Sequence, residues 1–252
     1  MFNIALNTFR EIVRNKFLYM ILFFAFAFIA FSISLWKLTI WDDKKIIIDF
    51  WLAMIEIFWI IWVLFVWSQL LFKEIEWKTI FLILSKPVRR YEFLVWKFLG
   101  FSLTIALIIL FQSILYLFIL YFKNIAITKL ILVSLFFTFL KLEILLVLVF
   151  FFSTFMSNIM TILVSVMIYF IAHSFSLLLD MAVRLKSMLF LDFLKILNVL
   201  FPPLEALNTK DYIWTPKLIT NTFLLENTFY WILFIIILLY FSSIIFSKKQ
   251  FS

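Results

Sequence analysis

The chain has 252 residues, of which 67% are apolar, and it contains 37 Phe, 10 Trp and a single Gly. Soluble globular chains average nearer half apolar residues and about 7% Gly. Only 14% of the residues are charged, which leaves too little polar surface to cover a soluble core. The abundance of aromatic residues also excludes an intrinsically disordered chain. The composition therefore indicates a protein whose solvent is the lipid bilayer.

The formal net charge is +8, and the basic residues flank long apolar runs. In a soluble protein such a charge suggests a nucleic-acid partner. Here no soluble recognition fold carries the basic clusters, so attraction to anionic lipid head groups is the simpler interpretation. We expect membrane lipid, and no nucleic acid, as a partner.

Missing residue types exclude several kinds of chemistry. The chain has no Cys, its one His is His173, and its one Gly is Gly100. Thiolate sites, multi-histidine metal sites and cysteine nucleophiles are thus excluded. Phosphate-cradling loops need several glycines, so we expect no Walker loop and no dinucleotide fingerprint. We expect no metal, no cofactor and no catalytic residue in this chain; if ATP drives it, another polypeptide hydrolyses the ATP.

Six stretches are long and apolar enough to cross a bilayer, which needs about 20 residues of helix. Residues 144–179 are uncharged, which is too long for one crossing, and we place a tight turn at the polar residues 153–158. The sequence predicts an all-α integral membrane protein with one transmembrane domain over 1–252. The expected spans are residues 17–36, 50–72, 98–122, 130–153, 159–179 and 227–247.

Six crossings put both termini on one side of the membrane. Basic residues are divided almost evenly between the two sides, and the most basic short loop, 73–97, favours the cytoplasm. We expect a multi-pass protein of the inner or plasma membrane with both termini cytoplasmic. Residues 1–16 carry a polar and an apolar stripe at helical spacing, which predicts an amphipathic interfacial helix. The alternatives are a solvated lead-in, or a signal peptide cleaved near Ala25-Phe26-Ala27.

The one sizeable outer segment is expected over residues 180–226. Its first part has a helical stripe, and Pro202-Pro203 stops that helix because proline has no backbone N–H to donate. A turn and a loop through Trp214 and Pro216 follow. This segment is interpreted as a connector by default, with a lid or a partner surface as alternatives.

Three charged residues, Glu56, Lys141 and Glu143, fall inside predicted spans. A lone charge there costs at least about 2.5 kcal/mol, so such residues usually pair or face water. Glu56 and Lys141 lie roughly 10 and 18 Å inside the outer edge at 1.5 Å per residue. We hypothesise that these two form a pair, between spans or between subunits, that lines a route, with Glu143 on another face. The alternative is snorkelling toward the interface. His173 is interpreted as a polar residue near the outer end of span five.

The loop between the second and third spans has the most distinctive pattern. Glu74 and Lys78 make a favourable i,i+4 pair, and Glu76 and Thr79 share a face. These pairs predict a short amphipathic helix at the membrane surface. Pro87 disfavours helix at the preceding residue, so a break is expected before the chain enters the third span.

Several motifs in this loop resemble the first cytoplasmic loop of type-two, exporter-like ABC transporter permeases. Weaker similarities are spread over nearly the whole chain, at Ala5–Glu11, Phe152–Phe155 and Phe201–Asn208, although Pro203 departs from the family's usual Pro-Asn. The loop motifs are Glu74-x-Glu76-x-x-Thr79, Ser85-Lys86-Pro87-Val88-x-Arg90-x-Glu92-Phe93 and Lys97-Phe98-x-Gly100.

The resemblance implies that this chain is one half of a transporter. Two six-span subunits would pair as a homodimer or heterodimer, and each would bind a separate ATPase subunit, which holds ATP and Mg, through a short cytoplasmic coupling helix between spans two and three. The expected contact residues are Glu74, Glu76, Thr79, Ser85, Lys86, Pro87 and Arg90. Alternatives from other classes are a membrane accessory or assembly protein, an intramembrane enzyme without an ATPase partner, and an ion-driven transporter. An ordinary inner loop whose charges only anchor the helices is the alternative for residues 73–97.

Overall fold

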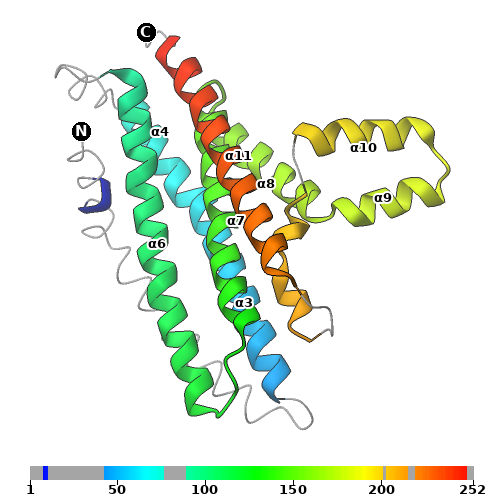
Figure 1. Cartoon of the computed structure of the whole chain (residues 1–252). Helices are drawn as coiled ribbons and strands as arrows, with labels where there is room; N and C mark the ends of the chain where they lie inside the picture. Colours follow the sequence, from blue (N-terminus) through cyan, green and yellow to red (C-terminus); the bar gives the residue numbers. More distant parts are fainter. Residues whose placement is uncertain (1–7, 11–42, 77–88, 201–202, 215–218, 249–252) are drawn as a thin grey trace.

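The computed structural model describes residues 8–10, 43–76, 89–200, 203–214 and 219–248 (Figure 1). Every regular element within these ranges is a helix, which confirms the predicted all-α class. The predicted first span, residues 17–36, and most of the predicted interfacial helix, residues 1–16, lie outside the described ranges.

Four helices of the described residues are long and apolar enough to cross a membrane, which supports a membrane-embedded protein. The first combines α3 (Asp43–Trp62), the π-helix η1 (Val63–Trp67) and α4 (Ser68–Glu76), with its apolar part at Ile47–Phe72. The other three are α6 (Arg90–Phe122), α7 (Lys129–Ser153) and α11 (Asn221–Lys248). Predicted spans two, three, four and six correspond to these helices, although span six starts earlier than expected.

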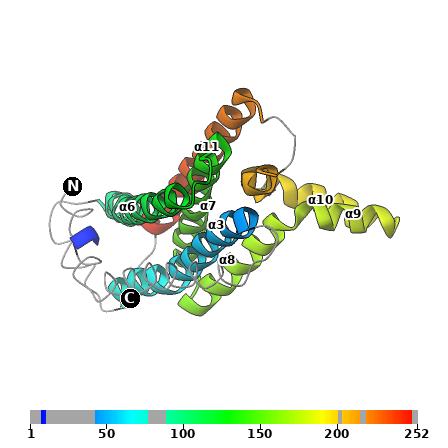
Figure 2. The same ribbon diagram turned by 90° about the horizontal axis from the view of Figure 1, so that it is seen from below.

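The predicted fifth span is not one straight helix. The chain turns at Thr154–Ser157, as predicted, and then forms α8 (Asn158–His173) and α9 (Phe175–Arg184). The two are bent by 65° at Ser174, so they are one broken span or a re-entrant segment. α9 and α10 (Met188–Leu200) pack against each other as a hairpin that projects sideways from the bundle (Figures 1 and 2).

Helix α7 is the centre of the bundle. Seen from below, it lies between α6 and α11 on one side and α3 and α8 on the other (Figure 2). Most of its side chains are buried, including Phe137, Leu145 and Phe150. In contrast, α6 and α11 expose many large apolar side chains, as expected for helices whose outer faces contact lipid.

Local sequence explains both ends of α6. The Glu92 carboxylate accepts a hydrogen bond from the Arg89 N–H at 2.9 Å and forms a capping box, so the helix begins several residues before 98, where the third span was predicted to start. Its other end is a Schellman motif. Asn124 is left-handed with φ 52°, and Ile125 N–H donates to Leu120 C=O at 2.9 Å.

Because α6 begins at Arg90, Lys97 lies inside the helix rather than at its start. Its side chain is buried, and its ammonium group lies 5.6 Å from the centre of the Phe101 ring. This cation–π contact helps to hold a charge that the predicted boundary had left outside the span.

The two ends of the bundle differ in which helix termini they hold. At the C-terminal end, α4 ends, α6 begins, and α11 ends at Lys248 (Figure 1). The opposite end holds the start of α3 and the loop between α6 and α7. There a hydrogen bond from Lys129 to Asn221 joins the starts of α7 and α11.

Candidate functional site

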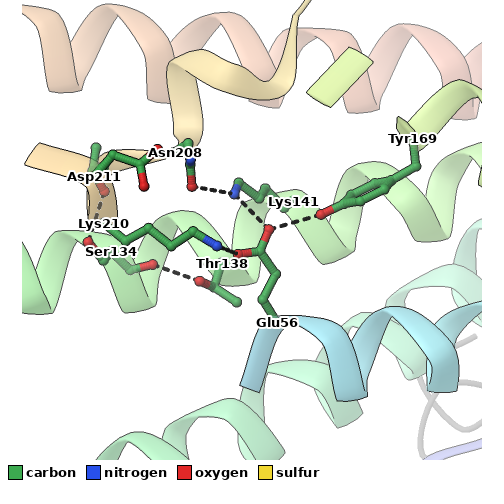
Figure 3. Close-up of polar contacts among 9 residues, drawn as sticks. Glu56, Ser134, Thr138, Lys141, Tyr169, Asn208, Lys210 and Asp211 are labelled. Atoms are coloured by element: carbon green, nitrogen blue, oxygen red, sulfur yellow. Dashed lines mark hydrogen bonds and ion pairs between the residues drawn. The ribbon is translucent and has the colours of Figure 1, made fainter. Parts of the chain in front are cut away.

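Charged and polar side chains from four parts of the chain meet inside the bundle (Figure 3). Glu56 comes from α3, Lys141 from α7, Tyr169 from α8, and Lys210 from the 3₁₀ helix η3 (Thr209–Tyr212). We call these four residues the charge cluster. At 1.5 Å per residue, Glu56 lies about 13 Å along the apolar segment that starts at Ile47. Lys141 lies about 18 Å from the start of α7 by the same rise. The cluster is therefore near mid-depth of the spans.

The Glu56 carboxylate is the acceptor at the centre of the cluster. Its Oε1 accepts hydrogen bonds from Lys141 Nζ at 2.7 Å and from the Tyr169 hydroxyl at 2.9 Å. Its Oε2 accepts from Lys210 Nζ at 2.9 Å. Glu56 is 3% exposed and Lys141 is 2% exposed, so their ion pair is shielded from solvent. Buried charges are stable only when they are paired and hydrogen-bonded in this way.

The predicted pair of Glu56 and Lys141 is confirmed, and it joins two spans of one chain. The sequence around Glu56 and Lys141 did not indicate which other residues they contact. Asn208, whose Oδ1 lies 3.4 Å from Lys141 Nζ, Lys210 and Tyr169 were not predicted as part of the site. Lys210 is 154 residues from Glu56 along the chain, and no local pattern signals such a contact.

Lys210 belongs to residues 203–214, which we call the cap segment. It contains two 3₁₀ helices, η2 (Leu204–Leu207) and η3, and packs against α7 and α8. Leu204, Leu207 and Thr209 are buried. Backbone that is not α-helical is tolerated at membrane depth only when protein or water surrounds it, and here α7 and α8 provide the protein surroundings. The cap segment is therefore packed into the bundle, and the interpretation of residues 180–226 as a connector stays a prediction.

Further hydrogen bonds hold the cap segment against α7, α3 and the bend between α8 and α9. The Thr209 and Ser134 hydroxyl oxygens lie 3.1 Å apart, which joins the cap segment to α7. Trp214 Nε1 donates to Asp49 on α3 at 2.8 Å. The Glu205 carboxylate accepts from the Ser176 backbone N–H at 2.8 Å, near the bend between α8 and α9. Asp211, next to Lys210, accepts a hydrogen bond from Asn208 Nδ2.

The buried face of α8 is polar from the cluster to the C-terminal end of the bundle. Its buried residues are Thr161, Ser165, Tyr169 and Ala172. Asn158 Oδ1, at the start of α8, accepts a hydrogen bond from Ser68 Oγ of α4 at 2.6 Å. The hydroxyls of Thr161 and Ser165 have no hydrogen-bond partner among the described residues. Buried hydroxyls of this kind usually bind ordered water.

His173 packs beside the charge cluster. Its ring stacks on that of Tyr169, with centroids 5.8 Å apart and planes 8° from parallel. No group of three or more His, Cys, Asp or Glu side chains that could hold a metal ion occurs in the described ranges. His173, at the C-terminal end of α8, therefore supports the orientation of the Tyr169 ring.

Glu143 is separate from the cluster, although it is only two residues from Lys141. It is 4% exposed, and its neighbour is Ser102 of α6 rather than a cation. Its Oε1 has no hydrogen-bond partner among the described residues. The prediction that Glu143 occupies another face of the helix than Lys141 agrees with this arrangement.

The residues expected to contact an ATPase subunit are only partly described. Glu74 and Glu76 lie in the last turn of α4, and Arg90 is the first residue of α6. Thr79, Ser85, Lys86 and Pro87 lie outside the described residues. The predicted coupling helix itself therefore stays a prediction.

An apolar groove of about 460 Å³ lies between the C-terminal half of α11 and the first turns of α6. Tyr91, Ile236, Tyr240 and Ser243 are among the residues that line it, and none of the charge cluster does. Its apolar lining and outward position are those of a lipid-facing surface, so the cluster remains the candidate site.

Replacing Tyr169 with Phe tests the hydroxyl's contribution to the cluster. The change removes one hydrogen bond to a buried carboxylate, and we expect unfolding to become easier by about 1.5–3 kcal/mol. Tyr240→Phe is the matched control, because its side chain is exposed and should change stability by about 0.5 kcal/mol or less. Thermal unfolding in detergent measures both. Equal effects of the two variants would show that the Tyr169 hydroxyl does not stabilise the cluster.

Chemically, the cluster holds one carboxylate and two ammonium groups inside the bundle. The Glu56 carboxylate is fully hydrogen-bonded, and the described cluster includes no Ser, Thr or Cys next to a base that would act as a nucleophile. No protein-family model matches the chain, and no curated protein matches it either. The function is therefore argued from this geometry and from the sequence motifs.

Proposed function

We propose that this chain is the membrane-spanning subunit of a transporter whose energy comes from a separate ATPase subunit. The observation that carries the proposal is the ion-paired cluster of Glu56, Lys141 and Lys210, buried at mid-depth in a bundle of membrane-length helices. Ionisable residues are rare at such positions, because each is costly to insert, and they mark substrate and ion pathways.

The source of energy is proposed from the sequence. The loop motifs at residues 74–100 resemble those of type-two ABC permeases, and the chain's single Gly excludes a phosphate-binding loop of its own. We propose that the coupling segment around Glu74 and Glu76 contacts the ATPase in the cytoplasm. In this arrangement the C-terminal end of the bundle is cytoplasmic, and two such subunits pair to form the complete transporter.

The described helices offer a mechanical connection for this function. α4, which carries Glu74 and Glu76, joins α3, which carries Glu56, through the π-helix at Val63–Trp67. π-helical turns are rare overall, and those that occur are often found at functional sites. They are also places where a helix can bend. Hydrogen bonds flank the π-helix on both sides, from Ser68 to Asn158 and from Tyr169 to Glu56. Movement of α4 by the ATPase would thus be passed to the charge cluster.

Co-purification tests this proposal. Affinity-tagged chain from its native membrane is expected to bring down a protein with nucleotide-binding motifs, and the complex is expected to have vanadate-sensitive ATPase activity. Glu74→Lys/Glu76→Lys should reduce recovery of that protein roughly 10-fold or more, because it reverses the charge at both proposed contact positions. Each factor of ten corresponds to about 1.4 kcal/mol of binding free energy.

Asp180→Lys/Asp192→Lys is the matched control. It makes the same change of charge on exposed residues of α9 and α10, away from α4. This variant is expected to keep the ATPase subunit bound. If the wild-type chain recovers no nucleotide-binding protein from membranes in which it is functional, the proposed source of energy is wrong.

A further inference from the structure

Lys210 differs from the other charged members of the cluster in its access to solvent. Its side chain is 25% exposed, whereas Glu56 is 3% and Lys141 is 2% exposed. It is also contributed by the cap segment and not by a spanning helix. Lys210 can therefore leave the cluster into water together with the cap segment, while Lys141 is enclosed by the bundle.

The two oxygens of Glu56 have different partners. Oε1 is held by Lys141 and Tyr169, both from spanning helices. In the described residues Oε2 accepts its hydrogen bond from Lys210 alone, at 2.9 Å. Departure of Lys210 would leave the Glu56–Lys141 pair neutral and intact. Oε2 would then be an unpaired carboxylate oxygen, directed at the space that the ammonium group had filled.

The other described polar contacts of the cap segment are hydrogen bonds and not ion pairs. The contact of Asn208 with Lys141 is long, at 3.4 Å, and the contact of Thr209 with Ser134 is between neutral hydroxyls. The bonds of Trp214 to Asp49 and of Ser176 to Glu205 are exposed to solvent. Among the described contacts, the pair of Lys210 with Glu56 is thus the one ion pair that joins the cap segment to a buried carboxylate.

We propose that Glu56 Oε2 is a binding site for the primary ammonium group of a ligand, and that Lys210 occupies this site when the cap segment is closed. The ligand class is a cation that carries a primary amine, either free in solution or as the head group of an amine lipid. This names a substrate class for the proposed transporter and rests on that function to that extent. The binding itself requires no ATPase subunit.

The neighbours of Oε2 favour an ammonium group over a bare metal cation. Calcium takes six to eight oxygen ligands and Na⁺ likewise needs a shell of oxygens. Here the other oxygen of the carboxylate is bound to the Lys141 ammonium, which has no lone pair to ligate a metal. An ammonium group needs only hydrogen-bond acceptors, and Oε2 already accepts from one such group, that of Lys210, at 2.9 Å.

Chemical rescue tests the site without knowledge of the natural ligand. Lys210→Ala removes the ammonium group and most of the stem, and is expected to lower the apparent melting temperature in detergent. Methylammonium chloride should raise the melting temperature of this variant by roughly 3 °C or more over its effect on the wild type, since a ligand of the folded state stabilises it. Tetramethylammonium, which has no N–H donor, and sodium chloride should not.

Two further variants keep the test decisive. Glu56→Gln/Lys210→Ala lacks the acceptor charge, so methylammonium should give it no more stability than it gives the wild type. If Lys210→Ala does not fold, Lys210→Met is used, whose side chain ends one atom short of Nζ, and the ammonium ion is the probe. Absence of rescue in the folded Lys210 variant would overturn the proposal, and so would equal rescue when Glu56 is Gln.

Reconstitution separates the two sources of the amine. The Lys210→Ala chain is compared in nanodiscs of phosphatidylcholine and in nanodiscs that contain phosphatidylethanolamine. Stabilisation by methylammonium in phosphatidylcholine discs identifies a site open to soluble amines. Stabilisation by phosphatidylethanolamine alone identifies a lipid head-group site. A variant stabilised by neither has no amine site, and this result would leave the co-purification test of the ATPase unaffected.

Discussion

Glu56→Gln is expected to lower the free energy of unfolding by about 3–5 kcal/mol, because it removes one partner of a buried ion pair and leaves the other charged. Lys141 would keep its ammonium group at 2% exposure without the carboxylate that now lies 2.7 Å from it. The loss should be measurable as a lower apparent melting temperature and as faster unfolding in a harsh detergent.

The double variant Glu56→Gln/Lys141→Met distinguishes pairing from independent contributions. It removes both charges and replaces the lysine with an apolar side chain of similar length. Such replacements of a buried pair are often neutral or stabilising, so the double variant should recover much of the stability that Glu56→Gln loses. The sum of the two single losses, observed in the double variant, would show that the residues do not act as a pair.

Glu143→Gln is the matched control for Glu56→Gln. Glu143 is the same residue type at 4% exposure and close to Lys141 in sequence, but among the described residues its polar neighbour is Ser102 and not a cation. Replacing it with a neutral amide removes no ion pair and should change stability by about 1 kcal/mol or less. A loss as large as that of Glu56→Gln would mean that burial of the carboxyl group, not the ion pair, accounts for the effect.

Locking the cap segment to α7 is expected to stop transport. The Ser134 and Thr209 hydroxyl oxygens are 3.1 Å apart, so Ser134→Cys/Thr209→Cys places two thiols near bonding distance. The chain has no Cys of its own, and only this disulfide can form within it. If the cap segment must open in each cycle, the oxidised variant should lose roughly 10-fold or more of its transport-coupled ATPase turnover, and a reductant should restore it.

The two single variants, each treated with the same oxidant, serve as controls for this experiment. Neither can form the cross-link, so both should keep wild-type turnover under oxidising and reducing conditions. Full turnover by the quantitatively cross-linked variant would show that the cap segment stays closed during transport. In that case Lys210 would be a structural partner of Glu56 and not a replaceable occupant of its site.

Much of the fold follows from local sequence. Apolar stretches near residues 98–122 and 130–153 are long enough to insert, and the polar residues Ser153 to Asn158 interrupt a stretch too long for one crossing. These signals predicted α6, α7 and the turn at Thr154–Ser157. The bend at Ser174 was missed, because His173, Ser174 and Ser176 are uncharged and neither Pro nor Gly marks a break there.

The candidate site divides in the same way. Glu56 and Lys141 were recognisable because a charge in an apolar stretch is costly and needs a partner. Lys210 and Asn208 lie in a polar segment, where such residues are ordinary and carry no signal. That this segment folds back into the bundle depends on Leu204 and Leu207 packing between α7 and α8, which is a tertiary contact.

The sequence by itself determined that the chain is a membrane-spanning helical protein without a nucleotide-binding loop, since insertion depends on the transfer free energy of each stretch and cofactor loops depend on local residue types. Only the tertiary structure decided that Glu56 also meets Lys210 and Tyr169. Those contacts join residues 154 and 113 positions apart. The depth and direction at which each helix and the cap segment pack fix which side chains meet, and helical periodicity within one segment carries no information about another.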